Sequence, residues 1–276
     1  MATREAIPVS TAAGEAVSED RILGGRLRLL QPRRGARVAI DTMLLAAAVS
    51  ARPGERVIEA GSGSGAAALA VACRCPGVEV TGIEIAADLV AIANRSAALN
   101  GLADRVRFLE GDITERPLAL GRGQFDHAFA NPPYLSAARS SPPPHRGRAR
   151  AYVGGRAGLA DWIDFCLDMV REKGGVTFVH RVDHLDAILA RLHGRAGEIV
   201  VCPLWPREGV PAKRILVHAR KGMRGGAMMV PGIVLHAPGG GFTDAAEAVL
   251  RGAQGIDLTR RAVARLAQSP PAGPGA

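Results

Sequence analysis

Short apolar strand-like runs alternate with helical segments through most of this chain, and this alternation limits the fold more than any other feature. Strands that alternate with helices form βαβ units, whose strands are parallel and whose helices cover the sheet. We therefore predict an α/β, doubly wound, Rossmann-like sheet of seven mostly parallel strands, with ligands bound beyond the carboxyl ends of the strands. The expected strands are 56–60, 78–84, 106–109, 125–130, 175–179, 199–202 and 214–218, and the expected helices are 66–75, 88–100, 159–171 and 184–193.

The alternation occupies one domain, and shorter segments flank it on both sides. A chain of 276 residues is long enough for one well-packed α/β domain with appendages. Before the domain, a short strand precedes a helix that we expect to begin at Asp41, an acceptable N-cap. The expected division is 1–20 as a disordered lead-in, 21–54 as an N-terminal appendage, 55–220 as the main domain, 221–256 as a C-terminal strand–helix appendage and 257–276 as a disordered tail.

Composition narrows the class of partner. The net charge is +9, and most of the excess is arginine, which binds phosphate through paired hydrogen bonds and stacks on bases. This balance favours nucleic acid, although a compositional bias toward Ala, Gly and Arg would produce the same charge. No run has membrane-spanning length and no apolar leader opens the chain, so we expect no membrane partner and a cytoplasmic location. The four cysteines form no CxxC pair and have no His at ligand spacing, which predicts neither a disulfide nor a metal site.

A glycine-rich turn stands where the first strand of the domain gives way to its first helix. It reads Glu-Ala-Gly-Ser-Gly-Ser-Gly over 59–65, and Gly61, Gly63 and Gly65 would allow a tight turn and close approach of a ligand to the backbone. Gly61, Gly63 and Ala66 also satisfy the G-x-G-x-x-G/A dinucleotide fingerprint. A nucleotide-binding module without catalytic activity, for example an NAD(H) sensor, therefore stays an alternative.

Acidic residues after successive strands favour S-adenosyl-L-methionine as the cofactor. Glu59 would repel a pyrophosphate but suits the ammonium group of a methionine moiety. Glu84 ends the second strand, where its carboxylate can accept hydrogen bonds from both ribose hydroxyls. Asp112 follows the third strand, where it can accept one from the adenine amino group. The apolar cover for the adenine ring would come from Ile83, Ile85 and Ile113.

The sequence Asn-Pro-Pro-Tyr over 131–134 follows the fourth strand and suits the recognition of a planar amino group. Pro132 and Pro133 stiffen the segment and lack N–H donors, which leaves the Asn131 side-chain oxygen and nearby carbonyls as acceptors. An exocyclic amino group needs two acceptors, and a flat base or amide needs an aromatic face such as Tyr134. A proline turn after a buried strand would read the same way, but the position downstream of the glycine turn favours methyl transfer.

The turn at 59–65, Glu84, Gly111-Asp112 and the 131–134 motif resemble those of class I S-adenosyl-L-methionine-dependent methyltransferases that modify amino nitrogens. The resemblance spans residues 21–250. Finer features resemble the bacterial tRNA(Val) adenine-N6 methyltransferase family. They are Asp-Thr-Met-Leu-Leu over 41–45, the lack of a large second domain and the late 235–244 element.

This resemblance implies in-line transfer of a methyl group to an exocyclic amino nitrogen. The amino group would donate to the Asn131 side-chain oxygen and the Pro132 carbonyl, and Tyr134 would stack on a base taken out of its own stack. No strong general base is needed, because the sulfonium is an activated leaving group and orientation does most of the remaining work. The implied partner is tRNA. Candidate phosphate contacts are Arg33, Arg34 and Arg37 before the domain, Arg139, Arg146, Arg148 and Arg150 after the motif, and Lys213-Arg214 beside Trp205.

Several substrates share this motif, and N6 of adenine in tRNA is the leading prediction. Protein glutamine-N5 methyltransferases acting on release factors use the same Asn-Pro-Pro-Tyr logic, but usually carry a helical domain ahead of the catalytic one. Here residues 1–55 alone precede the first strand of the domain. DNA adenine methylation is less favoured because no inserted target-recognition region is evident, and guanine-N2 enzymes more often carry Phe at the last motif position.

Overall fold

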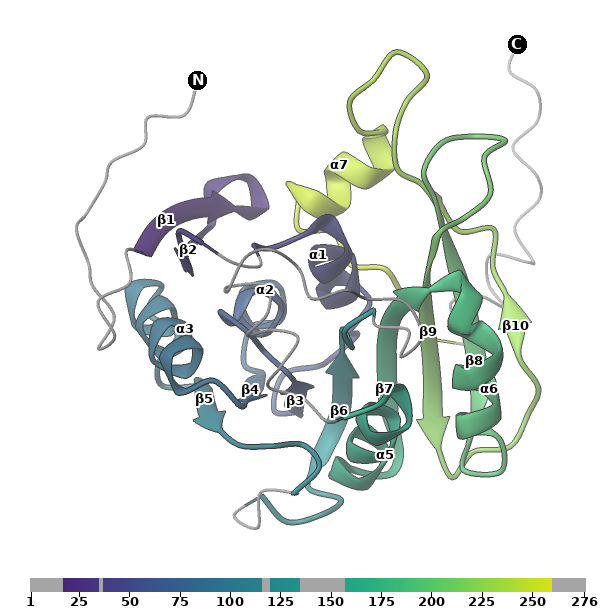
Figure 1. The fold of residues 1–276 in the computed structure, drawn as a ribbon, viewed down its shortest axis with the longest axis horizontal. Helices are drawn as coiled ribbons and strands as arrows, with labels where there is room; N and C mark the ends of the chain where they lie inside the picture. Colours follow the sequence, from purple (N-terminus) through teal and green to yellow (C-terminus); the bar gives the residue numbers. More distant parts are fainter. Residues whose placement is uncertain (1–16, 35–36, 116–119, 135–156, 260–276) are drawn as a thin grey trace.

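The computed structural model describes residues 17–34, 37–115, 120–134 and 157–259. In this part of the chain, the centre of the fold is one nine-stranded sheet (Figure 1). Its strands are β3 (Arg56–Ala60), β4 (Glu79–Glu84), β5 (Val106–Glu110), β6 (Phe125–Ala130), β7 (Val170–Arg181), β8 (Ala196–Trp205), β9 (Arg214–Lys221), β10 (Met228–Met229) and β11 (Ile233–Val234). Their order is β10-β8-β9-β7-β6-β3-β4-β5, with β11 also paired to β8.

The five strands from β3 to β7 are parallel to one another, and β9 runs antiparallel between β7 and β8. The chain order reverses between β3 and β6, which is the switch point of a doubly wound sheet. The predicted α/β doubly wound fold is therefore confirmed. The seven predicted strands correspond to β3 through β9, and the two-residue strands β10 and β11 add to the sheet beyond them.

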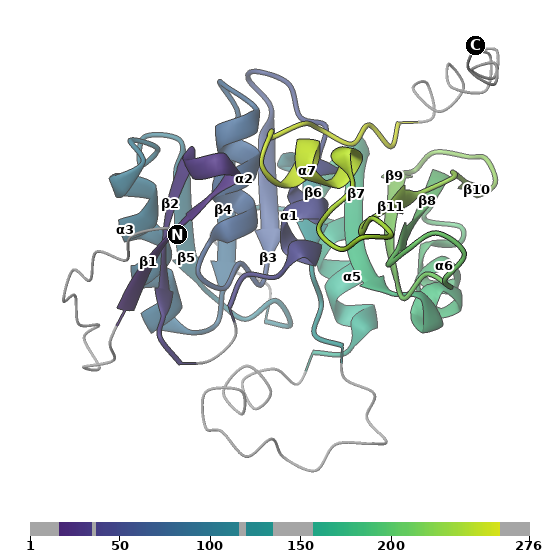
Figure 2. The same cartoon turned by 90° about the horizontal axis from the view of Figure 1, so that it is seen from above.

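Helices cover both faces of the sheet (Figures 1 and 2). On one face, α1 (Ile40–Ala47), α2 (Ala66–Arg74), α3 (Ala87–Leu99) and α7 (Asp244–Leu250) share a buried core with Val57. On the other face, α5 (Leu159–Met169) and α6 (Leu185–Leu192) share a second core with Ile58. Successive residues of β3 thus enter opposite cores, as the two-residue period of a strand requires. No helix of the described residues has the length and apolar character needed to cross a membrane.

An N-terminal hairpin lies beside α3 (Figure 2). Its strands β1 (Val17–Ile22) and β2 (Leu27–Pro32) are antiparallel, and the Leu30 N–H donates to Ser96 Oγ of α3 at 3.0 Å. The disordered lead-in predicted over 1–20 is wrong for residues 17–20, because Val17 is buried and Glu19 pairs with Arg28 at 2.7 Å. The rest of that lead-in, 1–16, lies outside the described residues. The disordered tail predicted over 257–276 is wrong at its start, because Leu258 is buried in the core, and residues 260–276 lie outside the described residues.

The predicted bounds of α2, α3 and α6 differ from the structure by one residue, and those of α1 and α5 differ for identifiable reasons. Helix α1 begins at Ile40 after the N-cap Ala39, so Asp41 lies in its first turn and is not the cap that the sequence predicts. Its carboxylate has partners from distant segments instead. Helix α5 ends at Met169, two residues before the predicted end, because Val170 already pairs with Phe125 of β6.

Candidate active site

The loops after β3, β4, β5 and β6 meet at one edge of the sheet, since these strands are parallel neighbours. The pairs Ala60–Ile83, Glu84–Glu110 and Ala60–Ala130 keep the strand ends in register. The glycine turn follows β3, Glu84 ends β4, Asp112 follows β5 and the Asn-Pro-Pro-Tyr motif follows β6. The topology thus brings the predicted cofactor and target residues to the edge where doubly wound sheets bind ligands.

The three glycines of the turn at 61–65 have different reasons to be glycine. Gly61, Gly63 and Gly65 have φ of 62°, 54° and 85°, in the left-handed region that disfavours residues with a Cβ. A Cβ on Gly61 would lie 2.2 Å from the Trp162 ring, and one on Gly65 would lie 2.6 Å from the Phe108 ring. At Gly63 no heavy atom lies within 4 Å of the Cβ position. The turn is therefore packed on two sides and open at its middle, where a ligand can approach the backbone.

Glu84 connects the glycine turn to the end of β4. Its Oε2 accepts a hydrogen bond from the Gly63 N–H at 2.8 Å, and its Oε1 accepts one from the Ala86 N–H at 3.1 Å. A carboxylate has about four acceptor positions, so each oxygen retains one for a further donor. Glu84 is half-buried at the edge of the sheet. This arrangement fits a pair of ribose hydroxyls of S-adenosyl-L-methionine.

Glu59 lies beneath the turn and supports helix α2. Its side chain is buried, and Oε2 accepts a hydrogen bond from the Ala68 N–H at 2.9 Å. The N-cap of α2 is Gly65, which has no side chain, so Glu59 satisfies one of the free N–H groups of the first helical turn. Burial raises the pKa of Glu59 well above its usual value, and the charge of Glu84 adds to this effect. The predicted contact with a methionine ammonium group stays a prediction.

The residues predicted around the adenine ring divide between surface and core. Asp112 Oδ1 accepts hydrogen bonds from the backbone and hydroxyl of Thr114, at 2.8 Å and 2.7 Å, which fixes the turn after β5. Ile85 is 43% exposed, and Ile113 is buried beside this turn. Ile83 is fully buried in the core under α5, so the prediction that it covers the adenine ring is wrong. Ile85 is left as the exposed apolar side chain at this edge.

The Asn-Pro-Pro-Tyr motif is held at both ends by helix α1. Asn131 Nδ2 donates to Thr42 Oγ1 at 3.3 Å, and the Tyr134 hydroxyl donates to Asp41 Oδ2 at 3.0 Å. Between them Pro132 is buried and Pro133 is exposed. Because the Asn131 amide donates to Thr42 through its nitrogen, its oxygen is the atom left to accept from a target amino group.

The Tyr134 ring lies against the side chains of Arg214 and His180. The Arg214 guanidinium carbon lies 4.5 Å from the ring centroid, and the His180 ring meets it edge-on with centroids 5.2 Å apart. Burial raises the pKa of Tyr134, and the Asp41 charge and hydrogen bond raise it further. Burial, with the nearby His184, lowers the pKa of His180 to about 4. No sequence pattern points to His180, whereas Thr42 is marked only as part of the 41–45 segment and Arg214 only as part of a basic pair.

The basic residues predicted to contact RNA differ in whether other side chains already pair with them. Arg37 forms an ion pair with Asp20 of the hairpin, and Arg33 Nε donates to the Val17 carbonyl at 3.4 Å. Arg34 is exposed and has no partner among the described residues. Of the predicted pair Lys213-Arg214, Lys213 is exposed and Arg214 donates to Asp41. The remaining predicted contacts lie outside the described residues; they are Arg139, Arg146, Arg148 and Arg150.

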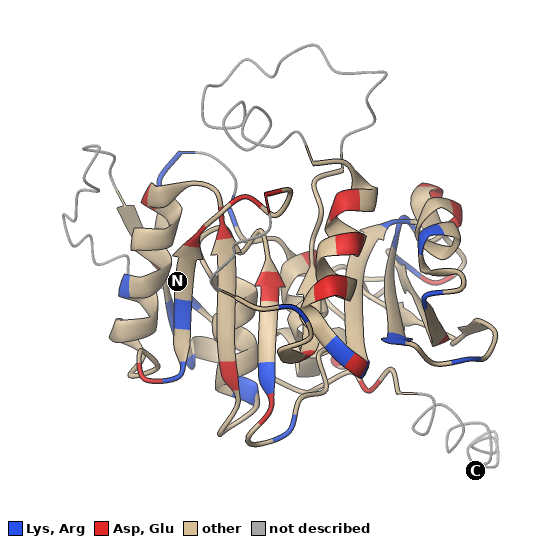
Figure 3. Ribbon diagram, turned by 90° about the horizontal axis from the view of Figure 1, so that it is seen from below, with Lys and Arg blue, Asp and Glu red and all other residues tan. Residues whose placement is uncertain are grey.

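Charge is unevenly divided along the chain. Ten of the 35 Lys and Arg residues, but only two of the 26 Asp and Glu residues, fall outside the described ranges. The described part therefore carries 25 basic and 24 acidic residues. Figure 3 shows both signs spread over this part of the ribbon, with acidic residues along α5. The basic excess of this protein is thus almost entirely a property of the remaining stretches of sequence.

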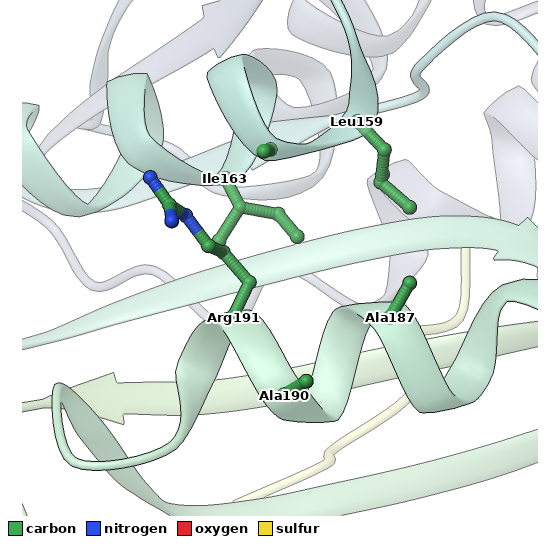
Figure 4. Close-up of a pocket in the computed structure, with 6 residues that line it drawn as sticks. Leu159, Ile163, Ala187, Ala190 and Arg191 are labelled. Carbon is green, nitrogen blue, oxygen red and sulfur yellow. The ribbon is translucent and has the colours of Figure 1, made fainter.

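A cavity of about 260 Å³ lies between α5 and α6, away from these loops (Figure 4). Arg191 at its rim forms an ion pair with Asp164 of α5. No predicted cofactor or target residue lines it, so it is separate from the candidate site. The cavity is lined by Leu159, Ala160, Ile163, Ala187, Ala190 and Arg191.

In the described ranges, no three His, Cys, Asp or Glu side chains gather as a metal site would require.

Comparison with known proteins identifies the class. Residues 57–141 match the family model described as "Methyltransferase domain". A predicted O-methyltransferase from Agrobacterium tumefaciens has a similar crystal structure, with a TM-score of 0.65 and 29% identity over 78% of this chain and 97% of that one. The chain therefore contains a class I methyltransferase domain of α/β fold, whose cofactor is S-adenosyl-L-methionine.

Curated relatives of this domain are methyltransferases with different named targets. A release factor glutamine methyltransferase from Chlorobaculum tepidum is 32% identical over 48% of this chain and 46% of its own length. A tRNA1(Val) (adenine(37)-N6)-methyltransferase from Vibrio campbellii is 22% identical over 68% of this chain and 77% of its own. The match with the Chlorobaculum relative spans less than half of that protein. The two relatives thus share methyl transfer and differ in the molecule that they modify.

Proposed function

We propose that this protein transfers a methyl group from S-adenosyl-L-methionine to an exocyclic amino nitrogen, and that this nitrogen is N6 of an adenine in tRNA. The observation that carries the proposal is the orientation of Asn131 at the end of β6. Its Nδ2 donates to Thr42 Oγ1 at 3.3 Å, so its oxygen is free to accept a hydrogen bond from an amino group of a target.

The residues of the motif would work by orientation. When bound, the cofactor supplies an electrophilic methyl group. The Asn131 oxygen and the Pro132 carbonyl would accept the two N–H groups of the target, which fixes the direction of the nitrogen lone pair. Tyr134 is unsuited to act as a base, because its hydroxyl donates to Asp41 and burial raises its pKa. The role of Tyr134 would therefore be to form one wall of the target site.

Charge supports RNA as the substrate. The described body of the protein is close to neutral, and the excess of arginine lies in the other stretches of sequence. One of these, 135–156, begins directly after Tyr134 and contains five Arg and no acidic residue. Arginines next to the target motif would bind the phosphates that flank a nucleotide in the site. A protein glutamine substrate has no such need for phosphate contacts.

A protein glutamine is the second candidate, and one observation favours it. The Arg214 guanidinium lies 4.5 Å from the centroid of the Tyr134 ring and so occupies a position where a base could stack. A glutamine amide is smaller than adenine and presents its amino group without needing an aromatic face. The same Asn131 acceptor would serve either target.

A labelled-methyl assay separates these candidates. The protein is incubated with methyl-labelled cofactor and either total tRNA or release factor, and the products are digested and identified. We expect label in tRNA as N6-methyladenosine. Label confined to protein as N5-methylglutamine would replace the leading proposal with the second. The matched variant is Asn131→Ala, which should lose methyl transfer to either substrate while still binding the cofactor. Stabilisation by NAD(H) rather than by S-adenosyl-L-methionine in a thermal-shift comparison would contradict both.

A further inference from the structure

Two consecutive residues of helix α1 hold the two ends of the target motif. Thr42 accepts from Asn131 Nδ2 at 3.3 Å, and Asp41 accepts from the Tyr134 hydroxyl at 3.0 Å. Helix α1 precedes the main domain, and the two contacts span 89 and 93 residues of sequence. The motif is therefore fixed by a segment that belongs to none of the βαβ units around it.

Asp41 also fixes Arg214, which begins strand β9. Arg214 Nε donates to the same Asp41 Oδ2 at 3.0 Å, and the guanidinium lies 4.5 Å from the centroid of the Tyr134 ring. The Asp41 side chain is 13% exposed and that of Arg214 is 31% exposed. The three side chains thus contact one another pairwise and form a closed triangle, in which Tyr134 is held at both its hydroxyl and its ring.

We propose that Asp41 and Arg214 are positioning residues of the methyl-transfer site, which hold Tyr134 and the attached Asn131 in the arrangement that receives the target amino group. This inference rests on the proposed function, because it assigns both residues to that reaction. A target held by hydrogen bonds is sensitive to small displacements, since a shift of about 1 Å at a reacting group can cost roughly a hundredfold in rate. The triangle restrains the motif against such shifts without contacting the target amino group.

Asp41→Asn tests this role, and Asp164→Asn is its matched control. Asp164 of α5 likewise pairs with two arginines, Arg191 of α6 and Arg195, which follows that helix. The methyl-transfer rate is measured in a single turnover at saturating cofactor and substrate, together with the affinity for S-adenosyl-L-homocysteine. We expect Asp41→Asn to slow transfer at least about tenfold with little change in affinity, and Asp164→Asn to transfer at the wild-type rate. Asp41→Asn that is no slower than Asp164→Asn would overturn the inference.

Arg214→Lys keeps the charge but loses the planar guanidinium, and it guards against a folding defect in the first variant. We expect it to slow transfer by less than Asp41→Asn does, because Lys can still pair with Asp41 but cannot cover the Tyr134 ring in the same way. Combined with Asp41→Asn, it should add little further loss. Rate effects that multiply in the double variant would show that the two residues act separately, against the proposal.

A spectroscopic measurement reports the triangle independently of the reaction. The chain has two tyrosines, Tyr134 and Tyr152, so Tyr152→Phe leaves Tyr134 as the single phenol. Its ionisation can be followed by ultraviolet absorbance as the pH is raised. Asp41→Asn in this background should lower the pH midpoint of Tyr134 ionisation, and an unchanged midpoint would overturn the contact between Asp41 and Tyr134.

Wild-type protein that methylates neither tRNA nor release factor would overturn the proposed function, whereas an active enzyme insensitive to Asp41→Asn would overturn this inference alone.

Discussion

Glu84 accepts a hydrogen bond from the Gly63 N–H at 2.8 Å, and this single contact joins the end of β4 to the open middle of the glycine turn. It places a carboxylate directly beside the one glycine of the turn that has free space around its Cβ position. The turn and the acid are thus parts of one structure before any ligand binds. Their geometry is set by the parallel register of β3 and β4, in which Ala60 pairs with Ile83.

Glu84→Gln should therefore weaken cofactor binding. The amide loses the charge that strengthens hydrogen bonds to ribose hydroxyls, and its NH₂ group would face the Gly63 N–H. Hydrogen bonds to a charged group contribute about 1.5–3 kcal/mol, so we expect the Kd for S-adenosyl-L-homocysteine to rise roughly 10- to 100-fold in titration calorimetry. Glu79→Gln is the control, because Glu79 is exposed at the other end of β4. Equal Kd values for the two variants would contradict the ribose assignment.

Glu59→Gln should change stability and affinity in opposite directions. Burial raises the pKa of Glu59, so ionising it costs free energy in the folded protein and the cost increases as the pH rises above the usual glutamate value. Glutamine keeps an acceptor for the Ala68 N–H without the buried charge. We expect the ligand-free variant to unfold at higher temperature than wild type at pH 7, by the equivalent of about 1–3 kcal/mol.

The same variant tests the ammonium contact predicted for Glu59. If a cofactor ammonium group offsets the buried charge, Glu59→Gln should bind S-adenosyl-L-homocysteine more weakly although it is more stable. A more stable variant with unchanged affinity would assign Glu59 to the support of α2 alone.

The sequence predicts the strands and the glycine turn well because their signals are local. Alternating apolar runs, and glycines at positions with left-handed φ, reflect constraints that act within a few residues. The hairpin strand β1 is missed because its pairing with β2 depends on a partner, and only Val17 of its six residues is buried. A polar strand of this kind has no period that distinguishes it from an unstructured lead-in.

The residues of the candidate site can likewise be predicted only where a local pattern in the sequence marks them. Glu84 and Asn131 follow strands, and parallel topology places such residues together. Asp41 shows the limit, because an acid near the start of a helix predicts an N-cap, whereas its actual partners, Tyr134 and Arg214, lie 93 and 173 residues away. Contacts at such separations depend on how helix α1 packs against β7 and the rest of the domain, and no local pattern encodes them.

Acid should destabilise the protein partly through His218. This side chain is buried on β9, and its Nδ1 shares a hydrogen bond with the Thr177 hydroxyl at 3.0 Å. Burial disfavours its charged form, as do His127 and Arg220, whereas Asp257 has a smaller opposing effect. Its pKa is lowered from 6.5 to about 4. The unfolded chain therefore binds a proton that the folded protein refuses, and stability is lost as the pH falls from 6.5 toward 4.

The loss attributable to His218 over this interval is about 3 kcal/mol. His218→Asn keeps a polar atom near Thr177 without titrating, so its urea midpoint should depend less on pH between 6.5 and 4 than that of wild type. His193 is exposed, which makes His193→Asn the control. Identical pH profiles for wild type and His218→Asn would exclude His218 as a source of acid lability.

Gly61→Ala should destabilise the fold mainly through Trp162. The new Cβ would lie 2.2 Å from the Trp162 ring, and overpacking of this kind costs about 1–3 kcal/mol in addition to roughly 1 kcal/mol or more for a left-handed residue with a Cβ. Gly63→Ala is the matched control, because its φ of 54° gives similar backbone strain while its Cβ would meet no atom within 4 Å. We expect the midpoint of urea unfolding to fall further for Gly61→Ala than for Gly63→Ala.

Trp162→Phe in the Gly61→Ala background removes the colliding atoms and should recover part of the difference. Equal midpoints for the two glycine variants would mean that backbone conformation alone, rather than the packing of α5 against the turn, requires glycine at position 61.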